Sequence, residues 1–136
     1  MAEVFLRASI LLAVGLAASM ATWSIRRYYR SGPLPSRFDR SDALGVGAGP
    51  LLVEFTSPYC HDCQVALPIL EKGAKTHGTS LAVIDASQRP DLAAKYSIRS
   101  TPTILVVDRT DRVVGGWLTA PDPEDLDRYL AEASGF

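Results

Sequence analysis

LLVEFTSPYCHDCQVALPIL, residues 51–70, is the stretch of sequence that decides the fold. An apolar run is followed by a short turn, two cysteines spaced C-x-x-C and apolar positions at helical spacing, which predicts a buried strand that ends where a helix begins. Cys60 lies at this junction, where the unpaired N–H groups and the positive dipole end of the helix favour a thiolate. Cys63 lies on the same helix face, so the two sulfurs can form a disulfide.

Composition narrows the class of protein. The chain has 136 residues and an apolar fraction of 47%, as expected for one globular domain with an additional hydrophobic segment. Two closely spaced cysteines predict a redox-active or metal-binding pair rather than a disulfide scaffold. Residues 1–40 carry a net charge of +4 and residues 41–136 carry −5, so the folded part has no basic face for nucleic acid.

An uncharged segment, residues 8–25, lies near the N-terminus. As a helix it would span about 27 Å, close to the thickness of the hydrocarbon core of a bilayer. We therefore predict a transmembrane anchor with a basic flank over residues 1–30, a linker over residues 31–35 and a folded domain over residues 36–136. A cleaved signal peptide, with a small-residue cleavage site at residues 19–21, is the alternative.

The orientation of this single-pass anchor follows from its flanking charges. Arginines are concentrated on the C-terminal side of the segment, so the positive-inside rule places the domain in the cytoplasm. An extracytoplasmic domain is the alternative, because disulfides persist in oxidising compartments.

The remaining apolar patterns predict an alternation of strands and helices. The helix after the cysteines should contain Pro68, continue to about Thr76 and end at Gly78. Further elements are expected as a buried strand at 80–86, a short helix at 87–96, a strand at 103–107, its hairpin partner at 113–118 and a last helix capped by Asp122. This order predicts an α/β domain whose first two strands are parallel.

Together, these features resemble the thioredoxin family over roughly residues 36–134. The resemblance is carried by LLVEF-x₄-C-x-x-C, by Pro68 five residues after the second cysteine, and by IDASQRPDLAAKYSIRSTPTILVV. It implies a three-layer fold, with a central mixed sheet of about four strands between helices, and thiol–disulfide exchange with protein partners. The dipeptide between the cysteines, His61-Asp62, departs from the Gly-Pro of ordinary thioredoxins.

The resemblance also implies roles for individual residues. Cys60 is expected to attack the partner and Cys63 to resolve the mixed disulfide. Pro102 is expected to be the family's cis-proline. The substrate-binding residues are then expected to be Tyr59, His61, Thr101 and Pro102.

Glu54 lies in an otherwise apolar strand, where burial would raise its pKa. In the family an Asp often occupies this position, and the resemblance implies that Glu54 accepts the proton of Cys63. The family's lysine near this acid is replaced by an apolar residue, Leu81. The alternative is that Glu54 lies on a solvated edge.

Two other functions remain open from the sequence. The cysteines could form an inert structural disulfide in a non-catalytic binding module, or a metal site, which would need further ligands such as His61 or His77. No nicotinamide, flavin or haem motif is present, so we expect no cofactor. A monomer that receives electrons from another protein is the expected arrangement.

Overall fold

The computed structural model describes residues 1–30 and 33–135, except the side chains of residues 26–30. The chain divides into two compact units, residues 1–32 and residues 33–136.

The first unit is a single helix, α1 (Ala2–Arg30), which is longer than the predicted segment 8–25. Its stretch Ala2–Ile25 has 24 residues and contains an 18-residue window with a mean hydropathy of 2.0. Every residue of this stretch is exposed in the structure. A helix of this length and composition can cross a bilayer. The side chains of the predicted basic flank (Arg26, Arg27, Arg30) lie outside what the structure describes, as do the first two residues of the predicted linker, 31 and 32.

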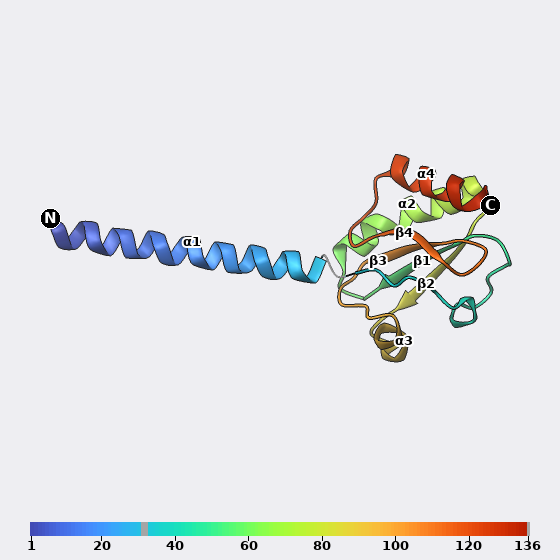
Figure 1. The fold of residues 1–136 in the computed structure, drawn as a ribbon, viewed down its shortest axis with the longest axis horizontal. Helices are drawn as coiled ribbons and strands as arrows, with labels where there is room; N and C mark the ends of the chain where they lie inside the picture. The colour runs from blue at the N-terminus through green and yellow to red at the C-terminus, as the bar shows by residue number, and fades with distance from the viewer. Residues whose placement is uncertain (31–32, 136) are drawn as a thin grey trace. The chain divides into compact units, whose positions relative to one another are not determined.

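The second unit is built on a four-stranded mixed sheet (Figure 1). Its strands are β1 (Leu51–Thr56), β2 (Ser80–Asp85), β3 (Thr103–Val107) and β4 (Val113–Trp117). The order is β2-β1-β3-β4, with β1 and β2 parallel and the β1–β3 and β3–β4 pairs antiparallel. The predicted parallel pair and C-terminal hairpin are therefore confirmed.

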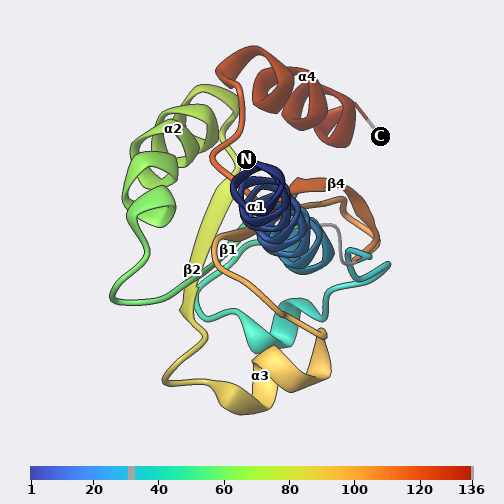
Figure 2. The same cartoon turned by 90° about the vertical axis from the view of Figure 1, so that its left-hand side faces the viewer.

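Helices cover both faces of the sheet (Figure 2). One face carries α2 (His61–His77) and α4 (Pro123–Ser134), and the other carries α3 (Pro90–Lys95) and the 3₁₀ turn η1 (Arg40–Asp42). Each face has its own core cluster because side chains alternate along the strands: Leu52 packs with Leu70 and Leu126, whereas Phe55 packs with Leu92. The three-layer fold expected from the sequence is confirmed.

Two predictions of local structure need correction. The strand at 80–86 was expected to be buried, but β2 is an edge strand and its Val83 is 47% exposed. Apolar side chains show that the two faces of a strand are covered, but they do not show whether both backbone edges are paired. The sequence pattern therefore does not distinguish an edge strand from a central strand. The helix expected at 87–96 begins later, at Pro90, because residues 85–89 form a turn in which Ser87 N–H donates to the Asp85 side chain.

The helix ends follow the predicted signals. Gly78 ends α2 in the left-handed conformation (φ 61°), which glycine adopts without strain because it has no Cβ, and its N–H donates to the Ala74 and Lys75 carbonyls. Asp122 caps α4 by accepting a hydrogen bond from Glu124 N–H. Pro68 lies inside α2, as predicted.

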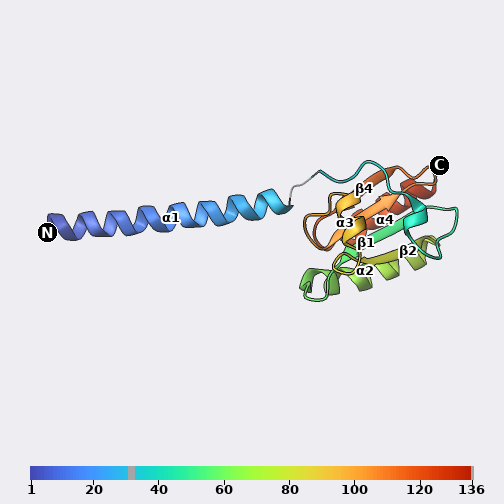
Figure 3. The same ribbon diagram turned by 90° about the horizontal axis from the view of Figure 1, so that it is seen from below.

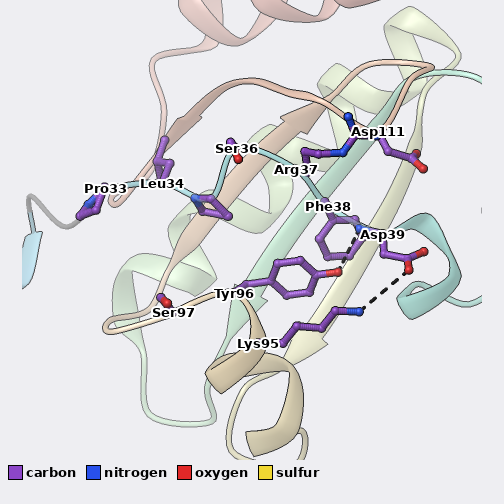
Figure 4. A pocket seen from close by; sticks show the side chains of 11 residues that line it. Pro33, Leu34, Ser36, Arg37, Phe38, Asp39, Lys95, Tyr96, Ser97 and Asp111 are labelled. Atoms are coloured by element: carbon purple, nitrogen blue, oxygen red, sulfur yellow. Dashed lines mark hydrogen bonds and ion pairs between the residues drawn. The ribbon is translucent and has the colours of Figure 1, made fainter.

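The segment that leads into this domain runs past β4 before the chain enters β1 (Figure 3). Val113 N–H donates to Ser36 O, and the Phe38 ring stacks on Tyr96 with a centroid distance of 4.8 Å. A cavity of about 670 Å³ lies between this segment and α3, where Tyr96 accepts from Asp39 N–H and Lys95 forms an ion pair with Asp39 (Figure 4). Neither cysteine lines this cavity, so its contacts hold the lead-in segment rather than the cysteine site.

Candidate active site

The two cysteines lie where β1 passes into α2. Cys60 is the N-cap residue of α2, with extended backbone, and its sulfur accepts a hydrogen bond from Cys63 N–H at 3.2 Å. The two cysteines form a disulfide across a Cα–Cα distance of 5.2 Å. Cys60 is partly exposed whereas Cys63 is 3% exposed. One sulfur is therefore accessible at the positive end of a helix and the other is protected behind it.

The loop before β3 lies next to this pair. The Thr101–Pro102 peptide bond is cis, as the resemblance implied, and Pro102 is buried. Thr101 shares a shallow depression of about 320 Å³ with Ser57, Tyr59, Cys60, His61 and Asp62. The structure thus brings three of the predicted substrate-binding residues (Tyr59, His61 and Thr101) together around Cys60, while Pro102 does not line the depression.

Aromatic and polar side chains at this depression are accessible to a partner. Tyr59 is fully exposed and His61 is exposed. An exposed aromatic ring beside a reactive sulfur offers contact area to a protein that approaches Cys60.

Glu54 lies in the central strand β1, six residues before Cys60 in the sequence. It is 1% exposed, so the alternative that it lies on a solvated edge is wrong. By strand alternation it shares a face with Leu52, which is the face covered by α2 and α4. Its Oε1 has no hydrogen-bond partner in the described part of the chain.

Burial changes the acidity of this carboxyl. The pKa of Glu54 is raised from 4.5 to about 7, mainly because burial disfavours its charged form and in smaller part because the negative charge of Glu71 repels it. Leu81, at the position where the family carries a lysine, packs against the α2/α4 cluster. A buried acid with a pKa near neutrality can take up or release a proton at working pH.

Ser57 is a site residue that the sequence interpretation missed. It lies in the loop between β1 and α2, and its Oγ is 2.9 Å from Thr101 Oγ1. Its carbonyl accepts a hydrogen bond from Cys60 N–H. No spacing rule connects residues 57 and 101, so only the folded chain reveals the contact.

The histidine considered as a further metal ligand lies elsewhere. His77 is the last residue of α2, and its Nε2 is 3.1 Å from Asp127 Oδ1 on α4. Among residues 1–30 and 33–135, no three His, Cys, Asp or Glu side chains are grouped to hold a metal ion.

A disulfide at the start of a helix, next to a cis-proline loop in a three-layer α/β domain, defines a dithiol–disulfide site. The family model for thioredoxin matches residues 39–132. The chain belongs to the thioredoxin family. This membership and the Cys60–Cys63 pair support a thiol–disulfide oxidoreductase.

Known thioredoxins match the same part of the chain. A chloroplastic M-type thioredoxin of Pisum sativum is 33% identical over 95 residues, which are 65% of this chain and 55% of that protein. The thioredoxin of Pyropia yezoensis is 31% identical over 87 residues, 60% of this chain and 81% of that protein. A mutant thioredoxin from Halobacterium salinarum NRC-1 shares the fold, with a TM-score of 0.58, 23% identity and coverage of 63% of this chain and 75% of that one.

Proposed function

We propose that this protein is a membrane-tethered oxidoreductase that exchanges dithiols and disulfides with protein partners through Cys60-His61-Asp62-Cys63. The single observation that carries the proposal is the pairing of an accessible sulfur at a helix N-terminus with a buried sulfur three residues later. An accessible thiolate can attack a partner, whereas a protected one reacts only within its own chain.

The exchange takes two steps. In the reduced protein the Cys60 thiolate attacks one sulfur of a partner disulfide, so a mixed disulfide forms and the partner's other sulfur leaves as a thiolate. The Cys63 thiolate then attacks the Cys60 sulfur and releases the second partner thiolate. Two electrons pass to the partner, and the Cys60–Cys63 disulfide is formed. Another protein dithiol must reduce it again.

Glu54 is the group that we assign to the proton of Cys63. Cys63 must lose its proton before it attacks, and a buried carboxylate whose pKa is about 7 can accept a proton near neutral pH. We expect Glu54→Gln to slow the second step, so mixed disulfides would persist longer, while the attack by Cys60 is little changed.

Four residues are assigned to the substrate. Thr101 and cis-Pro102 would present backbone to an extended segment of the partner, which is a strand-addition mode of recognition. Tyr59 and His61 would contact the same segment from the loop around Cys60. A protonated His61 would also stabilise the Cys60 thiolate.

The helix α1 supplies the proposed tether. At 1.5 Å per residue, its stretch Ala2–Ile25 is about 36 Å long, which is enough to cross the hydrocarbon core. Tethering raises the effective concentration of the domain near membrane partners. We assign the domain to the cytoplasmic side because arginines follow the apolar segment in the sequence.

Trapping of partners tests the exchange. Cys63→Ser should accumulate mixed disulfides that dithiothreitol releases, because the resolving thiol is gone, and Cys60→Ser should accumulate none. A Cys63→Ser protein that accumulates no mixed disulfide would contradict the assigned roles. It would favour the alternative, a binding module with a structural disulfide.

Labelling tests the orientation. A membrane-impermeant thiol reagent applied to cells treated with a permeant reductant should label Cys60 only after lysis. Cys60→Ser cells control for labelling of Cys63. Labelling of Cys60 before lysis would show that the domain faces outward.

A further inference from the structure

Ser57 makes two hydrogen bonds, one to each half of the cysteine site. Its carbonyl accepts from Cys60 N–H at 3.3 Å, next to the start of α2. Its hydroxyl is 2.9 Å from the hydroxyl of Thr101, and the pair is partly buried. The hydrogen bond between the Ser57 and Thr101 side chains therefore joins the loop that carries Cys60 to the loop that carries cis-Pro102, although the two residues are 44 positions apart.

The Thr101 loop is also supported from its other end. Thr103 Oγ1 donates to Ser100 O at 2.8 Å, and Thr103 is buried at the first position of β3. Thr101 thus lies in a loop that has the bond from Thr103 to Ser100 within it, and its own hydroxyl contacts the Ser57 hydroxyl of the opposite loop. Removing the Ser57 hydroxyl would remove the side-chain bond between this loop and the loop that carries Cys60, while the bond from Thr103 to Ser100 would remain.

We propose that Ser57 is a positioning residue that holds Thr101 beside Cys60 and thereby determines how well an extended protein substrate is bound. The inference rests on the proposed function and adds a specificity determinant to it. Ser57, Thr101 and Cys60 line the same depression, so a polypeptide bound at Cys60 lies across both loops. A small disulfide needs only the Cys60 sulfur, which accepts its hydrogen bond from Cys63 N–H, whereas the Ser57 hydroxyl is bonded to Thr101.

The test compares two oxidants of the reduced full-length protein in detergent. Insulin is the protein disulfide, with dithiothreitol regenerating the enzyme, and 5,5′-dithiobis(2-nitrobenzoic acid) is the small disulfide, added to prereduced protein. For Ser57→Ala we expect kcat/KM with insulin to fall about fivefold, the effect of one neutral hydrogen bond of about 1 kcal/mol, through a higher KM. The rate with the small disulfide should change by less than about twofold, since no strand contact is involved.

Matched variants separate positioning from general damage to the fold. Ser57→Thr keeps the hydroxyl and should retain wild-type kinetics. Thr101→Val removes the other hydroxyl at nearly constant volume and should reproduce the selective loss. The double variant Ser57→Ala/Thr101→Val should be no worse than either single variant, because both remove the same bond.

Two results would overturn the inference: an equal loss with both oxidants, or no loss with either. A wild-type protein that reduces neither oxidant would instead overturn the proposed function. These failures are distinguishable because the first two require an active wild-type protein.

Discussion

Replacing Glu54 by glutamine should remove a pH-dependent destabilisation of the native domain. The pKa of this carboxyl is about 7 in the folded protein and 4.5 ordinarily, so between these pH values the native state binds more protons than the unfolded state. The free energy of unfolding therefore falls as pH rises through this window. Since each pKa unit corresponds to 1.36 kcal/mol, the cost above pH 7 is about 3 kcal/mol, and it is absent below pH 4.5.

Urea unfolding of the oxidised full-length protein between pH 4.5 and 8.5 measures this effect. Keeping the Cys60–Cys63 disulfide intact prevents either thiol from titrating. We expect the free energy of unfolding of Glu54→Gln, relative to wild type, to increase by about 3 kcal/mol from the acid end of the range to pH 8. Glu132→Gln removes an exposed carboxyl on α4 and controls for the change in net charge.

Parallel curves for wild type and Glu54→Gln would refute the reasoning. They would mean that the Glu54 carboxyl ionises in the folded protein as easily as in the unfolded one. The pKa of Glu54 would then not be determined by its burial, although Oε1 has no hydrogen-bond partner among the described residues. The proton role assigned to Glu54 would lose its physical basis.

Three further variants test how the domain is held together. Gly116→Ala should destabilise it by about 2 kcal/mol or more, because the added Cβ would clash with the Ile104 carbonyl oxygen; thermal unfolding measures the loss, and an unchanged midpoint would contradict the close approach. Asp122→Ala should cost about 1 kcal/mol in urea unfolding by removing the N-cap of α4, whereas Asp122→Asn should retain most of it. Tyr96→Phe should cost about 2 kcal/mol because the Tyr96 hydroxyl donates to the Asp42 carboxylate; a smaller loss in the Asp42→Ala background would confirm the coupling, and an equal loss would contradict it.

Local signals made much of the fold predictable. The hairpin strands, the Gly78 stop and the Asp122 cap depend on residues close to one another in sequence, and the structure places each of them as expected. The cis bond before Pro102 was predicted only through family resemblance, because most X–Pro bonds are trans. The edge position of β2 was not predicted, since apolar pattern does not reveal which strand lacks a second neighbour.

The cysteine pair illustrates what the sequence determined alone. Placing Cys60 at the end of a strand and the start of a helix requires only the order of apolar residues, and the spacing to Cys63 then follows from helix geometry. Tertiary structure decided two further features, the complete burial of Glu54 and the contact between Ser57 and Thr101 beside Cys60. Both depend on segments distant in sequence that meet only when the sheet is assembled, because desolvation and hydrogen bonding act over a few ångströms of space rather than along the chain.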